Sequence, residues 1–253
     1  GNYGTSAQEV EQLFRTEIPH AIGPKGRANY QHLLLYAHGG LVSEGTAVQR
    51  LADYRAAMLD GGVYPLTFIW HSDFWSTVTN ILTEALRKRR PEGALDAAKD
   101  FMLDRLDDAL EPLARRLSGK ATWDEMKENA LAAAAPGGAA RQVVKHLAKM
   151  QATLPNGSLK VHLVGHSAGS IFLAPMVKLL VDAGVEIETC TLWAPACTTA
   201  LFKQHYLPAI DRNKIKRFAT FVLSDRAERD DHCAHIYNKS LLYLVSNALE
   251  ATV

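Results

Sequence analysis

Five short apolar runs, separated by segments with helical periodicity, constrain the fold of this chain more than any other feature of its sequence. They are rich in leucine, β-branched and aromatic residues and are bounded by turn residues, as buried strands of a parallel sheet are. The runs cover residues 32–37, 63–70, 159–164, 187–193 and 218–223, with helical patterns at 7–18, 48–59, 170–183 and 201–210. This alternation predicts an α/β fold, with a mostly parallel central sheet of about five strands and helices on both faces.

The length of the chain fits this architecture. It has 253 residues, of which 47% are hydrophobic, and single α/β domains reach about 200–250 residues. We therefore expect one domain over residues 1–253.

The segment between the second and third expected strands is far longer than one crossover helix requires. An apolar stripe runs along it at Leu95, Ala98, Met102, Leu106, Ala109, Leu113 and Leu117. A capping-box pattern at 122–125 predicts the start of a second helix, and Pro136-Gly137-Gly138 separates that helix from a third at 139–154. One of these three helices must form the crossover connection to the third expected strand. We therefore interpret residues 72–138 as an insertion that forms a helical cap over a ligand site, with a plain packing extension as the alternative.

Charge, hydropathy and cysteine usage exclude several classes of function. The 28 Lys+Arg and 27 Asp+Glu give a net charge of +1, without the basic patch of a nucleic-acid-binding protein. No apolar stretch approaches the ~18 residues of a membrane span, so we expect a soluble protein with no nucleic-acid partner and no membrane span. Cys190, Cys197 and Cys233 fit neither a disulfide framework nor a zinc site.

The compartment and the oligomeric state remain open. The first residue is Gly1 rather than methionine, so we expect that an upstream segment has been removed. The few unpaired cysteines and the lack of a visible signal peptide favour the cytoplasm.

The sharpest motif is Gly165-His166-Ser167-Ala168-Gly169, placed between an expected strand and an expected helix. This G-x-S-x-G pattern predicts a tight, strained turn that holds the serine hydroxyl above the edge of the sheet. Glycines flank the serine because a Cβ at either position would clash. The start of the following helix favours negative charge near the turn. Ser167 is therefore the candidate nucleophile, and an ordinary structural turn is the alternative.

A second motif, His38-Gly39-Gly40, follows the first expected strand. Acyl transfer requires two N–H donors for the oxygen of the tetrahedral intermediate. The residue after the nucleophile, Ala168, would provide one, and Gly39 or Gly40 would provide the other, because glycine lets the backbone approach a substrate closely. His38 itself is interpreted as a residue that holds this loop rather than as the catalytic base.

With these two motifs the chain resembles serine hydrolases of the α/β-hydrolase superfamily, of the esterase and lipase type, from about residue 32 to 225. The resemblance implies a nucleophile, an acid and a histidine in that chain order. Ser167 matches the nucleophile. Asp225 follows the last expected strand, where this family carries its acid, and Asp230 and Asp231 are alternatives.

The histidine departs from the family pattern. It usually follows one more helix and one more strand, but here the chain stops soon after an expected helix at 240–249. After Asp225 only His232 and His235 are available. His235 is the tentative base and His232 the alternative. Truncation at both ends would also explain the pattern, with the base then lying beyond residue 253.

The remaining aromatic and metal-capable residues have mostly structural interpretations. His162, His166 and the pair His71 and Asp73 carry no recognisable site pattern, and the spacing around His232 matches no metal site. Phe74, Trp75 and Trp123 would line an acyl pocket or, as the preferred alternative, belong to the core.

These observations predict hydrolysis of a carboxylic ester with an uncharged acyl group, by covalent catalysis and without a cofactor or metal. The motifs do not separate an ester from an amide or thioester. A hydrolase-fold domain that binds a ligand without catalysis, and a fragment of a larger hydrolase, are the alternatives.

Overall fold

The computed structural model describes residues 4–22, 31–40, 43–70, 74–88, 107 and 110–250. The chain divides into two compact units. The first consists of Gly1–His71 and Asn129–Phe221, and the second of Ser72–Glu128 and Val222–Val253.

The first unit is built on a five-stranded sheet in which all the neighbouring strands are parallel, in the order β2-β1-β3-β4-β5. The strands are β1 (Gln31–Ala37), β2 (Val63–Phe68), β3 (Leu159–His166), β4 (Ile187–Trp193) and β5 (Ile215–Phe221). This architecture confirms the predicted α/β fold class.

The last strand differs most from its prediction. It begins at Ile215 and ends at Phe221, whereas the apolar run suggested 218–223. The reason is the neighbouring strand: Phe221 pairs with Trp193, the last residue of β4, so residues beyond Phe221 have no partner in the ladder.

Helices connect the parallel strands, as parallel pairing requires. α3 (Glu44–Asp60) joins β1 to β2, and α8 (Gly169–Asp182) joins β3 to β4. Two short helices, α9 (Thr199–His205) and α10 (Leu207–Asp211), join β4 to β5 where one helix was expected. Pro208 is the second residue of α10, in the first turn of a helix, where proline is tolerated.

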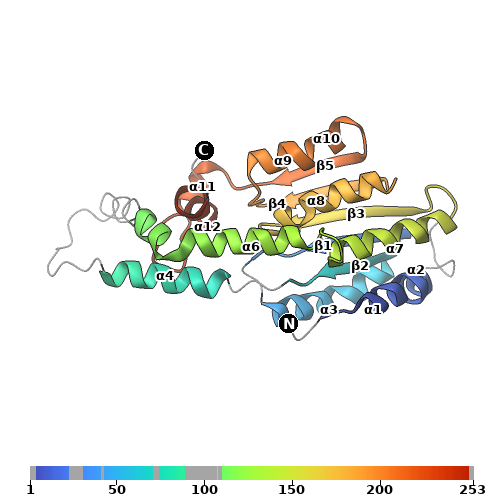
Figure 1. Cartoon of the computed structure of the whole chain (residues 1–253), viewed down its shortest axis with the longest axis horizontal. Helices are drawn as coiled ribbons and strands as arrows, with labels where there is room; N and C mark the ends of the chain where they lie inside the picture. The colour runs from blue at the N-terminus through green and yellow to red at the C-terminus, as the bar shows by residue number, and fades with distance from the viewer. Residues whose placement is uncertain are drawn as a thin grey trace. The chain divides into compact units, whose positions relative to one another are not determined.

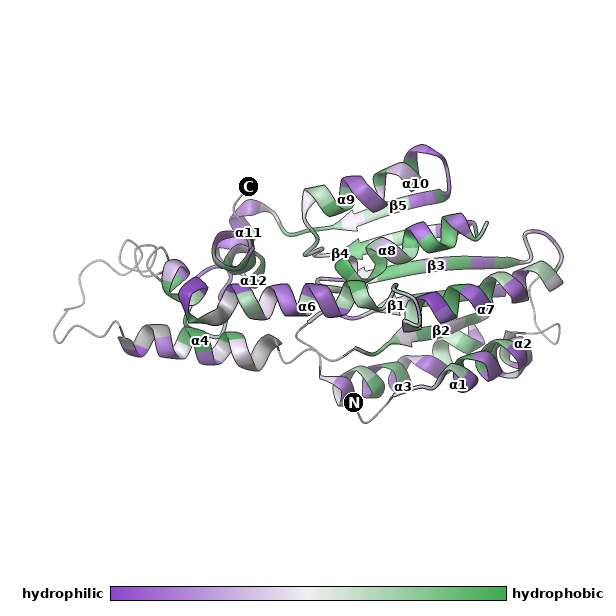
Figure 2. Ribbon diagram, in the orientation of Figure 1, coloured by the Kyte–Doolittle hydropathy of each residue, from purple (hydrophilic) through white to green (hydrophobic). Residues whose placement is uncertain are grey.

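Side chains alternate between the two faces of the sheet. Leu33, Leu35 and Leu163 point to one face and are completely buried. α8 packs on this face against β3 and β1, and Figure 1 shows α7 (Ala139–Thr153) beside it. Figure 2 shows β3 in hydrophobic green over most of its length, while α7 alternates between green and purple. Helix α3 lies on the opposite face, where Leu34 and Tyr36 share a pocket with its side chains.

The N-terminal segment is helical, as expected, but not uniformly so. It runs through α1 (Ala7–Gln12), a π-helical turn η1 (Leu13–Glu17) and α2 (Ile18–Ile22). Ser6 caps α1 in a complete capping box with Glu9. Val10, Phe14 and Ile18 form the buried side of this segment.

The described part of the second unit contains α4 (Phe74–Lys88), η2 (Arg115–Gly119), the greater part of α6 (Lys120–Ala132), α11 (Asp225–Arg229), α12 (Leu241–Leu244) and η3 (Val245–Leu249). The predicted helix start at Thr122 is wrong. The chain enters α6 directly from η2, so the helix begins at Lys120 and needs no cap.

Two other predictions about this region are only partly addressed. Residues 95–106 and 109 of the predicted apolar stripe lie outside the described residues, so the cap over 72–138 stays a prediction. Trp123 is buried, and its indole N–H donates to Glu250 at 2.8 Å within the second unit. It is therefore a core residue here, while the side chains of Phe74 and Trp75 lie outside the described ones.

Candidate active site

Ser167 occupies the turn between β3 and α8, with a backbone φ of +50°. An L-residue rarely adopts such a positive φ. The free-energy cost of this backbone conformation is tolerated only where the surrounding structure holds the residue in place. The sequence motif predicted this strained strand-to-helix turn. Within the described part of the chain, the Ser167 hydroxyl has no hydrogen-bond partner.

The glycines on either side of Ser167 are required by close packing. A Cβ at Gly165 would lie 3.0 Å from Leu173 Cδ1 and 3.1 Å from the Gly169 carbonyl oxygen. A Cβ at Gly169 would lie only 2.1 Å from the carbonyl oxygen of Ala37, the last residue of β1. The elbow therefore fits against the end of the neighbouring strand only with glycine at 169.

Backbone hydrogen bonds from the loop after β4 hold the turn. The Ser167 N–H donates to the Trp193 carbonyl at 2.8 Å, and the Ala196 N–H donates to the Ser167 carbonyl at 3.2 Å. The hydroxyl of Ser170, which is completely buried, also donates to the Ser167 carbonyl and accepts from the Cys197 N–H. Sequence reasoning missed these contacts, because nothing in the local pattern shows that the loop after β4 packs on the elbow.

The His38-Gly39-Gly40 loop lies against the same turn. A Cβ at Gly39 would be 3.1 Å from Ser167 Cβ and 3.1 Å from His166 Nδ1. Within the described residues, the N–H groups of Gly39 and Ala168 donate to no other group. Both are therefore available to an oxyanion, which is the role predicted for Ala168 and for Gly39 or Gly40.

His38 is held on both ring nitrogens. Its Nδ1–H donates to the Gly39 carbonyl at 2.8 Å, and its Nε2 accepts from the Trp70 N–H at 3.3 Å. The Trp70 indole N–H donates to the His38 carbonyl at 3.2 Å, and the two rings stack. Burial lowers the pKa of His38, so the neutral form is favoured. These contacts support the interpretation of His38 as the residue that holds the glycine loop.

The topology places this loop and the elbow together. β1 and β3 are neighbours in the sheet, and the chain continues from them to opposite sides, to β2 and to β4. In open α/β sheets, ligands bind beyond the carboxyl ends of the strands at such a switch point. Gly39 and Ser167 stand at this switch point.

Asp225 belongs to the second unit and is the first residue of α11. Its carboxylate accepts a hydrogen bond from the Tyr243 hydroxyl and forms an ion pair with Arg229 at 3.1 Å. Both interactions lower the pKa of Asp225, so the ionised form is favoured. Of the alternatives, Asp230 pairs with Arg226, and Asp231 accepts from the His232 N–H.

His232 and His235 also belong to the second unit, where they are exposed. Their rings lie 4.3 Å apart, and His235 has a φ of +55°. Among the described residues, neither ring is hydrogen-bonded to Asp225. The structure thus brings together Ser167, Ala168, Gly39 and Gly40, whereas the assignment of Asp225, His235 or His232 to Ser167 stays a prediction.

Two other histidines form a polar chain across the sheet. His32 Nδ1 lies 2.9 Å from His162 Nε2, and His162 Nδ1 lies 2.8 Å from the Thr189 hydroxyl. Burial, together with the nearby His32, lowers the pKa of His162 to about 4. His166, the last residue of β3, also has a pKa lowered by burial and by Arg50. His71 and Asp73 lie outside the described residues.

This chain of histidines predicts a pH-dependent stability. The ordinary pKa of histidine is 6.5, so the unfolded chain takes up a proton at position 162 more readily than the folded chain. Folding stability therefore falls as the pH drops from about 6.5 to about 4, and partly exposed His162 accounts for about 1–2 kcal/mol of that loss. We expect urea unfolding at pH 7, 5.5 and 4 to show a smaller loss for His162→Gln. The same substitution at exposed His20 is the control. If His162→Gln loses as much unfolding free energy between pH 7 and pH 4 as the wild type, the pH dependence does not come from His162.

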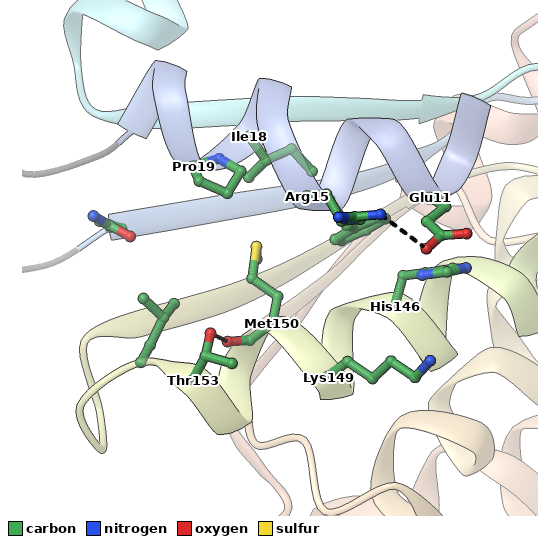
Figure 3. A pocket seen from close by; sticks show the side chains of 11 residues that line it. Glu11, Arg15, Ile18, Pro19, His146, Lys149, Met150 and Thr153 are labelled. Carbon is green, nitrogen blue, oxygen red and sulfur yellow. Dashed lines mark hydrogen bonds and ion pairs between the residues drawn. The ribbon is translucent and has the colours of Figure 1, made fainter. Parts of the chain in front are cut away.

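Two pockets formed by described residues of the first unit differ in their position on the sheet. One, of about 540 Å³, lies between α3 and the sheet, and His38 and Trp193 are among its lining residues. The other, of about 470 Å³, is shown in Figure 3 between the N-terminal helical segment and α7. Gln31, the first residue of β1, lines the second pocket. Strand β1 carries the chain about 20 Å from Gln31 to Ala37 before it reaches the loop at Gly39, so this pocket is not part of the candidate site.

The three cysteines are free thiols, and Cys190 and Cys233 are buried. Within the described residues there is no group of three or more side chains of metal-binding type. None of the described helices combines the length and the apolar character that crossing a membrane requires.

Comparison with protein-family models finds no matching family, and a search of curated proteins finds no similar sequence. The geometry of the site is therefore the basis for assigning a function.

Proposed function

We propose that the chain is a serine hydrolase of the α/β-hydrolase type that cleaves carboxylic esters through an acyl-enzyme on Ser167. The observation that carries this proposal is the positive φ of Ser167 at the carboxyl end of β3, with the glycine loop after β1 packed against it. A nucleophile in a G-x-S-x-G turn adopts this strained backbone because its side chain must stand clear of the sheet edge.

The proposed reaction proceeds in two halves. Ser167 Oγ attacks the ester carbonyl carbon while its proton passes to a histidine, with His235 the first candidate and His232 the second. The bond to the alcohol then breaks, the histidine returns the proton to the leaving alkoxide, and the acyl group stays on Ser167. Water repeats these steps, releasing the acid and restoring the serine. Asp225 would orient the histidine and stabilise its charged form.

The chain's own backbone would stabilise the intermediate. The Ala168 N–H and that of Gly39 or Gly40 would bind the oxyanion, and the N-terminus of the 14-residue helix α8 adds positive potential. Because the nucleophile is a side chain activated by proton transfer, this chemistry needs no cofactor.

A second candidate is a hydrolase-fold protein that binds a ligand at this site without cleaving it. The interactions of Asp225 favour this second candidate. Its carboxylate, which would orient the histidine of a catalytic triad, already accepts a hydrogen bond from Tyr243 and pairs with Arg229. A fluorophosphonate probe separates the two candidates, since it reacts with an activated serine and not with an ordinary one. We expect labelling at Ser167 by peptide mass spectrometry, together with hydrolysis of a short p-nitrophenyl ester. Neither result would occur in a binding protein.

The identity of the base is tested by replacing each histidine. We expect His235→Gln to lower kcat/KM for the p-nitrophenyl ester by at least about a hundredfold, because the proton transfer is lost. We expect His232→Gln to retain activity near that of the wild type. The reverse result would assign the base to His232, and full activity in both variants would exclude the two of them.

A further inference from the structure

The pocket between α3 and the sheet lies directly beside the candidate nucleophile. Two of its lining residues, His38 and Trp193, are also the immediate supports of the active-site turn. The Trp193 carbonyl accepts from the Ser167 N–H, and His38 holds the carbonyl of Gly39, which packs on Ser167. A molecule bound at Ser167 therefore has this pocket within reach, through residues that contact both.

The walls of the pocket are mainly apolar and aromatic. Helix α3 and strands β1–β4 provide the lining, which comprises Leu34, Tyr36, His38, Ala47, Arg50, Leu51, Tyr54, Met58, Pro65, Thr67, Val164 and Trp193. Tyr54 and Trp193 are 61% and 44% exposed, and exposed large aromatic residues at a cavity are typical of binding surfaces. The pocket extends along α3 from Ala47 to Met58, about 16 Å at the usual helical rise. Its volume of about 540 Å³ is that of a small-molecule site.

Arg50 is the one charged residue among those that line the pocket. In the described part of the chain its guanidinium forms no ion pair, so its charge is not neutralised locally. Its positive charge lowers the pKa values of His38 and His166, which flank the glycine loop and the elbow. Glu44 acts on His38 in the opposite sense and is the smallest contribution. Because α3 starts at Glu44, after the glycine loop, and ends at Asp60, before β2, Arg50 is nearer than Met58 to the end of the pocket that adjoins Ser167.

We propose that this pocket binds the acyl chain of an anionic amphiphilic ester, and that Arg50 binds an anionic group only a few bonds from the reacting carbonyl. This inference depends on the proposed ester hydrolysis, keeps the uncharged acyl group expected from the sequence and adds an anionic group to the rest of the ester. The long apolar wall suits the chain, and the unpaired guanidinium suits a carboxylate or phosphate. The specificity-determining residue is Arg50.

A matched pair of chromogenic esters tests the proposal. We would measure kcat/KM for ortho-nitrophenyl octanoate and for its analogue with one carboxylate on the nitrophenyl ring. The wild type should prefer the carboxylated ester, and Arg50→Gln should lower that preference by about fivefold, since the guanidinium is at the exposed rim. Arg50→Lys should retain part of the preference. Arg212→Gln, the same change at an exposed position outside the pocket, should leave it unchanged.

A binding measurement separates failure of the pocket proposal from failure of the hydrolase proposal. By calorimetry, the Ser167→Ala chain should bind octyl phosphate more tightly than octanol, and Arg50→Gln in that background should remove the difference. If the wild type cleaves neither ester but the Arg50-dependent binding is present, the hydrolase proposal fails and the pocket binds an anionic amphiphile without cleaving it. If both esters are cleaved at Ser167 and Arg50→Gln leaves their ratio and the binding unchanged, the pocket proposal is overturned.

Discussion

The Ser167→Ala variant should hydrolyse p-nitrophenyl esters at least about a thousandfold more slowly than the wild type and take up no fluorophosphonate. Removal of a serine nucleophile costs this much because the covalent route is lost entirely and only the oxyanion contacts and substrate binding remain. The fold should be retained, since the Ser167 N–H and carbonyl make the bonds that hold the turn. Initial rates and intact-protein mass spectrometry measure the two effects.

The matched control for this variant is Ser158→Ala. Ser158 lies just before β3, at the opposite end of that strand from the elbow, and its hydroxyl bonds only to the nearby Pro155 carbonyl among the described residues. It should keep the wild-type rate and labelling. Equal rates in Ser167→Ala and the wild type would sink the covalent mechanism.

The second large effect concerns stability. Gly169→Ala should destabilise the fold by about 3 kcal/mol or more, because the added Cβ must displace the end of β1 or the start of α8. The contact in question, 2.1 Å to the Ala37 carbonyl oxygen, is with backbone and so cannot be relieved by a side-chain rotation. The free energy of unfolding in urea, followed by circular dichroism, measures the loss.

Gly45→Ala provides the contrast within the same unit. Gly45 is in the first turn of α3, and a Cβ there would meet nothing within 4 Å. Alanine should therefore stabilise the helix by about 0.5–1 kcal/mol. A Gly169→Ala variant as stable as the wild type would mean that the elbow does not pack on β1 as described.

The sequence was sufficient to predict the structural elements that are determined by residues close together along the chain. Ser167 could be placed in a strained turn because the motif itself requires flanking glycines, and the strand at Ile187–Trp193 is found as predicted because its whole apolar run is paired. The end of β5 could not be predicted, because it depends on where the neighbouring strand stops. Likewise the start of α6 depends on the preceding π-helical turn, which leaves no signal in the sequence.

The contacts that support the site were beyond sequence reasoning for the same reason. Ser170 was visible only as a helix residue, although its hydroxyl links the elbow to Cys197. Arg50 belongs to an ordinary polar helix face, and only the sheet opposite it shows that it borders a pocket. The partners of Asp225 were also missed, because Tyr243 lies 18 residues further along the chain.

Helix α3 packs loosely on the sheet, so its residues tolerate substitution better than those of the elbow do. In this helix only Ala47 is buried, and Arg50, Tyr54 and Met58 follow one another at four-residue intervals along the pocket wall. Substitutions in this stripe cost little stability, while the tightly packed elbow tolerates almost none. In the proposed hydrolase, substrate range can therefore diverge by drift on one helix without passing through unfolded intermediates, and a randomised library at these three positions is the efficient route to altered selectivity.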